Sequence, residues 1–146
     1  MTHNHSKCLN KALATAETVL AARGETLTPL RKTVLQKVWG SHKSISAMDV
    51  VQQLKVKPPI AYRVLDYLHQ QGLVHHLHSV NAYVGCHCPA EQHASQFLIC
   101  TQCGEVTELA QTGPNTALNK QISAAGFTPT QTHIEVHGVC KACTEI

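Results

Sequence analysis

Apolar side chains recur at helical spacing in four successive segments of the first half of the chain, which predicts four amphipathic helices. Thr28 before Pro29 and the Ser46/Asp49 pair, which resembles a capping box, are start signals. The predicted helices cover residues 7–23, 28–39, 46–54 and 59–71, with stops at Gly24, Gly40 and Gly72. The residues expected to face inward are Leu9, Leu13, Ala16, Leu20, Leu30, Val34, Leu35, Val38, Met48, Val51, Leu54, Ala61, Val64, Leu65 and Leu68.

Two short strands are predicted after the fourth helix. Leu73-Val74 and residues 81–84 have the composition of strands, and residues 79–82 are expected to form the turn between them. Helix, helix, turn, helix and a two-stranded hairpin, in this order, predict a winged helix.

The second half of the chain has a different pattern. Residues 97–99 and 106–109 predict a hairpin, and residues 114–125 predict a helix with Leu118 and Ile122 inward, ending at Gly126. A last strand is expected around residues 134–139. These elements predict a small α/β domain, so that the whole chain belongs to the α+β class.

Charge and cysteine content divide the chain at about residue 84. Residues 1–84 hold ten Lys/Arg and four Asp/Glu, whereas residues 85–146 hold two and five, and all cysteines except Cys8 lie in the second part. We therefore predict two domains, residues 1–84 and 85–146. A basic first half favours an anionic partner such as nucleic acid, although a solvated basic face would have the same composition.

No segment approaches the ~20 apolar residues that a membrane-spanning helix needs, and the N-terminus lacks an apolar signal-peptide core. A cytoplasmic protein without a membrane partner is expected, and this compartment disfavours disulfides.

Two Cys-X-X-Cys pairs predict a structural zinc site. Cys100 and Cys103 form the first pair, Cys140 and Cys143 form the second, and Gly104 supplies a permissive turn after the first. Zn²⁺ takes four thiolates in tetrahedral geometry, and such a pair directs two sulfurs to one point. Redox-active dithiols and two disulfides are the alternatives. Redox sites usually carry one such pair beside a βαβ unit, so structural zinc is the preferred interpretation.

The outward face of the fourth helix carries candidate DNA contacts. Arg63 can bind guanine O6 and N7, and Tyr62 can reach a phosphate or a thymine methyl group. Outward Asp66 would repel phosphate, and some winged helices bind proteins rather than DNA. The candidate phosphate contacts are Arg31, Lys32, Lys55 and Lys57.

A second group of possible metal ligands lies outside the two cysteine pairs. Its members are His75, His76, His78, Cys86, His87, Cys88, His93 and Glu108. Any one of these histidines is more often an exposed polar residue than a ligand. Together, mixed imidazole, thiolate and carboxylate donors suit Zn²⁺. Because such a site has fewer thiolates, we expect it to bind zinc more weakly and exchangeably than four cysteines do.

Four motifs, in family order, resemble the ferric uptake regulator superfamily over nearly the whole chain. Residues 27–31 (LTPLR) are similar to its LTPxR start, and residues 57–65 (KPPIAYRVL) to its recognition helix. Residues 99–104 and 137–143 resemble its zinc knuckles. The Pro-Pro before Tyr62-Arg63 and the segment NAYVGCH at residues 81–87 resemble the zinc uptake regulator branch. The chain lacks the HHxH run of the iron and peroxide branches before the first knuckle.

The resemblance implies a homodimeric, zinc-sensing repressor of zinc-uptake genes that binds a palindromic double-stranded operator. It assigns the four paired cysteines to structural zinc and implies about two zinc ions per monomer. It also implies that zinc sensing weakens in acid, because thiol and imidazole ligands bind metal without their protons. The regulatory ligands that it implies are His75, Cys86, His93 and Glu108.

Three alternatives remain at this point. An iron or peroxide sensor of the same superfamily and a thiol redox switch would share many of these residues. A zinc hydrolase would need an open metal position and a general base, and the sequence has no HExxH pairing, so no enzyme and no small-molecule substrate is expected. Ile60-Ala61 stands where the zinc branch usually has Thr-Val, which affects the expected operator preference.

Overall fold

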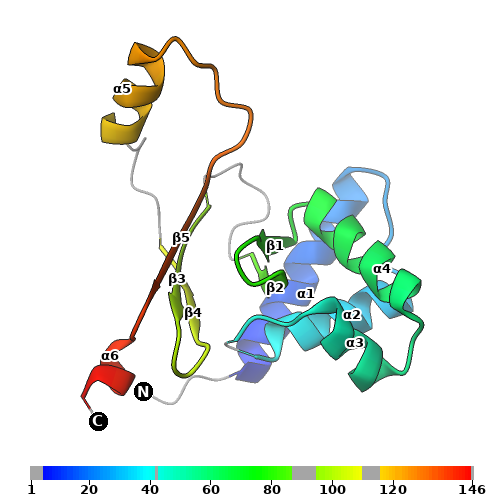
Figure 1. Ribbon diagram of the computed structural model, residues 1–146. Helices are drawn as coiled ribbons and strands as arrows, with labels where there is room; N and C mark the ends of the chain where they lie inside the picture. The colour runs from blue at the N-terminus through cyan, green and yellow to red at the C-terminus, as the bar shows by residue number, and fades with distance from the viewer. Residues whose placement is uncertain (1–4, 42, 87–94, 110–115, 146) are drawn as a thin grey trace. The chain divides into compact units, whose positions relative to one another are not determined.

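The computed structural model describes residues 5–41, 43–86, 95–109 and 116–145, which form two compact units, residues 1–92 and 93–146. Figure 1 shows the order of the elements. In the first unit they are α1 (His5–Ala22), α2 (Pro29–Trp39), α3 (Ala47–Leu54), α4 (Pro58–Gln70), β1 (Val74–Leu77) and β2 (Ala82–Gly85). In the second they are β3 (Ser95–Cys100), β4 (Val106–Glu108), α5 (Thr116–Ala124), β5 (His133–Gly138) and α6 (Lys141–Thr144).

The helices of the first unit begin where the sequence signals predict. Thr28 caps α2 by accepting a hydrogen bond from the backbone N–H of Arg31, with Pro29 in the first turn. Ser46 and Asp49 form a reciprocal capping box at α3, with distances of 3.1 and 2.9 Å. These caps set where α2 and α3 start and hence which faces the two helices turn to the core.

The first unit is a winged helix with an aliphatic core. Strands β1 and β2 form an antiparallel hairpin, and Tyr83 of β2 also pairs with Ile45 ahead of α3. The predicted stripe of α4 is buried in full. Completely buried side chains of α1, α2, α3, α4 and the hairpin meet in one cluster; the largest are Leu20, Leu35, Leu65, Leu68, Val34, Val38, Val50 and Val74.

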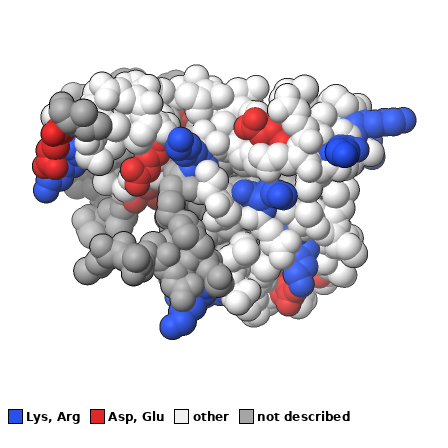
Figure 2. All heavy atoms as spheres, turned by 90° about the horizontal axis from the view of Figure 1, so that it is seen from below, with Lys and Arg blue, Asp and Glu red and all other residues white. Residues whose placement is uncertain are grey.

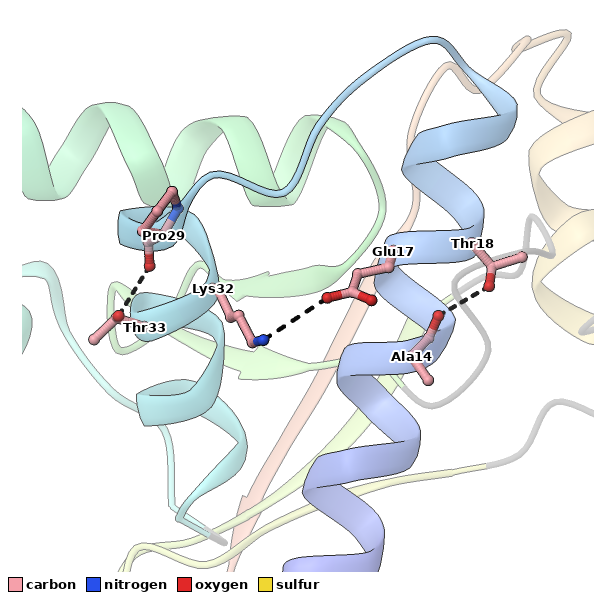
Figure 3. Close-up of polar contacts among 6 residues, drawn as sticks. All are labelled: Ala14, Glu17, Thr18, Pro29, Lys32 and Thr33. Carbon is pink, nitrogen blue, oxygen red and sulfur yellow. Dashed lines mark hydrogen bonds and ion pairs between the residues drawn. The ribbon is translucent and has the colours of Figure 1, made fainter.

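Helices α1 and α2 are also joined at their surface. Lys32 lies 3.9 Å from Glu17 across the two helices, and the Thr18 and Thr33 hydroxyls each donate to a carbonyl one turn earlier (Figure 3). About half of each ion-pair side chain is exposed, so this pair contributes at most about 1 kcal/mol.

The second unit is built on a three-stranded sheet with the order β4-β3-β5. Strand β3 pairs antiparallel with β4, as the predicted hairpin requires, and parallel with β5 over six residue pairs. Phe97, Ile99 and Cys100 are its buried apolar residues among those described. A mixed sheet of this size has little core of its own.

Some predicted details were wrong. Met48 is 48% exposed, and the buried residues of α3 are Ala47 and Val50. The hairpin strands also differ from the prediction: β1 extends toward the turn as far as Leu77, whereas β2 begins one residue later, at Ala82, because Asn81 adopts a left-handed φ of 47°. The start of the helix predicted over residues 114–125 lies outside the described residues. No helix among the described residues is long and apolar enough to cross a membrane.

Candidate functional site

Four cysteine sulfurs of the second unit lie close together. The Sγ atoms of Cys100, Cys103, Cys140 and Cys143 are all within 4.8 Å of one another. The Cys103–Cys140 and Cys100–Cys143 sulfur distances are 3.7 and 3.9 Å. A tetrahedral zinc site with Zn–S bonds of ~2.3 Å has edges of about 3.8 Å, so the four thiols fit one zinc ion. It is the only cluster of this kind within the described part of the chain.

The parallel pairing of β3 with β5 brings the two cysteine pairs together. Cys100, the last residue of β3, lies opposite Gly138, the last residue of β5. The Thr101 backbone N–H donates to the Gly138 carbonyl at 2.7 Å just beyond the strands. Gly104 turns the first pair with a φ of 77°, and Cys140 is the N-cap of α6. Helix α6 was not predicted from the sequence.

Backbone N–H groups make the four thiols inequivalent. The amides of Cys103 and Cys140 donate to the Cys100 sulfur at 3.5 and 3.3 Å, and they lower the pKa of its thiol to about 6. The neighbouring Cys140 sulfur, followed by burial, raises the pKa of Cys143 to about 12. Crowded thiols resist losing further protons until a cation is present. Metal binding at this cluster therefore displaces protons and weakens in acid.

The structure places three of the four predicted regulatory ligands. His75 is half-buried in β1, and Cys86 is buried directly after β2. Glu108 ends β4 in the second unit and is half-buried. His93 lies outside the described residues, as do His87 and Cys88. Proximity among the four ligands therefore stays a prediction.

The outer face of α4 presents the predicted recognition residues. Tyr62 is 42% exposed and Arg63 is exposed beside it. Two lysines are exposed just ahead of the helix. Lys57 is the N-cap of α4, and Lys55 has a left-handed φ of 53°. An open groove runs along this face; it is lined by Pro59, Tyr62, Arg63, Asp66, Tyr67 and Gln70.

Arg31 is held in place by α4. Its guanidinium carbon lies 3.5 Å from the centre of the Tyr67 ring, and its Nη1 donates to the Thr26 carbonyl at 2.9 Å. The Tyr67 hydroxyl donates to Glu25 at 3.0 Å, and burial, followed by this bond, raises the pKa of Tyr67. No pattern in the sequence indicates this anchor, because Arg31 and Tyr67 belong to different helices.

Asp66 is engaged with the hairpin. Its carboxylate accepts a hydrogen bond from the Tyr83 hydroxyl at 3.4 Å, and burial, followed by the Asp66 charge, raises the pKa of Tyr83. The repulsion expected between an outward carboxylate and phosphate is thus reduced in part by a contact that ties α4 to β2. Sequence separation hid this contact, because the two residues are 17 positions apart.

Basic side chains do not form one continuous patch on the face seen in Figure 2, where lysines and arginines are separated by other residues. Lys32, a predicted phosphate contact, is paired with Glu17.

The chain thus combines a winged helix with a sheet that carries a four-thiol cluster of zinc geometry. The family model described as "Ferric uptake regulator family" matches residues 22–137. The chain belongs to this family, whose members are transcriptional regulators and not enzymes.

Among the members of this family, the chain is similar to proteins described as zinc uptake regulators. The chain is 39% identical over 140 residues to the zinc uptake regulation protein of Escherichia coli K12, covering 92% of this chain and 82% of that protein. A zinc uptake regulator solved in complex with zinc and DNA is 38% identical, with a TM-score of 0.87 over 94% of this chain and 95% of that one. A solved structure described as holo XcZur is 36% identical, with a TM-score of 0.84 over 94% of this chain and 99% of that one.

Removing one ligand of the four-cysteine cluster is expected to unfold the second unit. Cys140→Ser leaves three thiolates for one zinc ion, and structural zinc in small domains supplies ~10–16 kcal/mol of apparent binding free energy. We expect the variant to bind one zinc ion fewer and to lose the protection of β3 and β5 amides against hydrogen exchange. Cys8→Ser, outside the cluster, is the matched control. An unchanged zinc content in Cys140→Ser would contradict the assignment.

Proposed function

We propose that this chain is a zinc-responsive, DNA-binding repressor of zinc-uptake genes that acts in the cytoplasm as a homodimer. The observation that carries the proposal is the pairing of an exposed recognition helix with a four-thiol cluster of zinc geometry in one chain. Relatives described as zinc uptake regulators, one of them bound to zinc and DNA, support it. The regulated genes would be those that import zinc.

DNA binding would place α4 in the major groove, as in other winged helices. Arg63, exposed in the second turn, can donate two hydrogen bonds to guanine O6 and N7. Tyr62 beside it offers a hydroxyl and an apolar ring face. Arg31, Lys55 and Lys57 would contact phosphates, and the Tyr67 ring limits how far Arg31 can move.

Dimerisation would use the second unit. Strand β5 lies at one edge of the described sheet, and an edge strand is the usual place for a second chain to pair. Val136 of β5 is 50% exposed, and Leu98 and Val139 are 39% and 46% exposed. A two-fold pairing of β5 edges would cover such a surface. Two copies of α4 would then read the two halves of a palindromic operator.

Zinc would have two roles, which implies about two ions per monomer. The four-cysteine cluster has the geometry of a structural site, and its ion would hold β5 and α6 to the turn after β3. The regulatory ion would be bound by His75, Cys86, His93 and Glu108. Thiolate, imidazole and carboxylate donors fit Zn²⁺, and the buried thiol of Cys86 offers a soft ligand that magnesium or calcium would not select.

Regulation would follow from where these four ligands lie in the sequence. His75 and Cys86 belong to the unit that carries α4, whereas His93 and Glu108 belong to the other. An ion that binds all four favours the conformations in which they meet. It can shift the equilibrium toward DNA binding only by its differential affinity for those conformations.

Loss of the Cys86 thiolate is expected to abolish the response to zinc. Cys86→Ser should keep the structural ion, bind one zinc ion fewer in total, and need at least ~10-fold more free zinc for operator binding. Zinc content and fluorescence anisotropy on labelled DNA at fixed salt measure both effects. His78→Ala, an exposed histidine of the hairpin turn, should behave like the wild-type protein. Wild-type zinc dependence in Cys86→Ser would show that the ligand set is wrong.

Arg63→Ala is expected to lose base discrimination. The variant should bind its best operator ~1–3 kcal/mol more weakly and should relax its preference at one base pair per half-site. Lys57→Ala is the matched control, because loss of a phosphate contact should weaken binding to all sequences alike and reduce the salt slope by ~1. Selection from a random-sequence library separates the two. An unchanged preference in Arg63→Ala would rule out its role in base readout.

A further inference from the structure

The indole of Trp39 lies directly on the backbone of Gly85. A Cβ atom at position 85 would be 2.4 Å from Trp39 Cε2 and 2.6 Å from Nε1, whereas non-bonded carbon atoms are normally ~3.5–4.0 Å apart. Trp39 is the last residue of α2, and Gly85 is the last residue of β2. The absence of a side chain at Gly85 therefore lets the end of α2 contact the end of the hairpin.

Gly85 immediately precedes Cys86, the thiol that we assign to regulatory zinc. The Cys86 backbone N–H donates to the Leu73 carbonyl at 3.1 Å, and the Leu73 N–H donates to the Leu68 carbonyl at 2.9 Å. Leu68 lies in the last turns of α4, so these bonds connect Cys86 to the recognition helix on one side. Trp39 restrains the same segment from the side of α2.

A cavity of about 160 Å³ adjoins this contact. Its lining includes Cys86, Trp39, Leu35, Leu73, Ala16 and Cys8. Space is therefore already present beside the indole. Removal of the ring would enlarge this cavity and take away the contact between Gly85 and α2.

We propose that Trp39 is a positioning residue for regulatory zinc: its indole, seated on Gly85, fixes the backbone of Cys86 and joins the metal ligand to α2. This inference rests on the proposed function, because it takes Cys86 as a ligand. Cys86 would then be connected to the DNA-binding unit in two ways: through the Trp39–Gly85 contact with α2, and through the hydrogen bonds by way of Leu73 to α4. Groups that orient metal ligands typically change metal affinity by ~10–100-fold when removed.

The test measures the affinity of the second zinc ion in protein whose four-cysteine cluster is filled, by competition with a chelator. Trp39→Ala should weaken this affinity by ~10–100-fold, and Gly85→Ala by about 10-fold, because the new methyl group displaces the indole. Trp39→Phe keeps an aromatic ring over Gly85 and should lose less than Trp39→Ala. Met48→Ala, an exposed apolar residue of α3, is the control and should bind like the wild type.

Rescue separates positioning from general destabilisation. The double variant Trp39→Ala/Gly85→Val restores volume at the contact from the opposite side, so its zinc affinity should exceed that of Trp39→Ala even though it carries one more substitution. Cobalt(II) at the second site adds a spectroscopic readout. Its thiolate charge-transfer absorption should weaken in Trp39→Ala and Gly85→Ala and recover in the double variant.

The outcomes are distinguishable from failure of the proposed function. In one outcome, Cys86→Ser loses the second zinc ion, but the folded variants among Gly85→Ala, Trp39→Phe and Trp39→Ala keep wild-type zinc affinity and cobalt absorption. That result refutes the role of Trp39 and leaves the assignment of Cys86 as a ligand intact. If Cys86→Ser keeps the second ion, the ligand assignment fails and the inference about Trp39 fails with it. Circular dichroism of each variant establishes which of them are folded.

Discussion

The parallel pairing of β3 with β5 is the constraint on which the second unit depends. It sets Cys100 opposite Gly138 and so brings two cysteine pairs, far apart in sequence, within reach of one ion. The sheet offers few buried apolar residues, which makes a cross-link at its end energetically important. Zinc binding and the β3–β5 pairing stabilise each other, because each cysteine pair supplies only two of the four thiolates that the ion needs.

The first unit holds α4 against its core and leaves the outer face of this helix exposed. Burial of one stripe of α4 fixes the rotation of the helix about its axis. Contacts at its flanks fix the groups around it: Tyr67 supports Arg31, and Tyr83 binds Asp66. A rigid scaffold of this kind reduces the entropy lost when DNA binds.

Much of this fold was predictable because its signals are local. The capping box at Ser46, the proline starts and the stripe of α4 are read from neighbouring positions, and the structure confirms them. The four-cysteine cluster was predictable because its spacing admits few other chemistries. Met48 was misassigned because a helix as short as α3 fits more than one apolar stripe, and burial then depends on tertiary packing.

The contacts that the sequence did not reveal are tertiary. The Trp39–Gly85 and Asp66–Tyr83 pairs join residues from different elements, and no periodicity within either element indicates them. Helix α6 was missed because its four residues, which follow Cys140 and include Cys143, are too few to show a repeating apolar pattern. These contacts lie next to Cys86 and at the side of α4, so we expect them to affect affinity more than fold.

The most direct test of the central claim is a titration of operator binding by the wild-type protein against buffered free zinc, at fixed salt and on duplexes selected from a random library. We predict that zinc raises DNA affinity by ~5–150-fold, the usual range of allosteric coupling, and that ferrous iron at the same free concentration does not. DNA affinity that stays constant across the zinc range, or that rises with iron alone, would contradict the account.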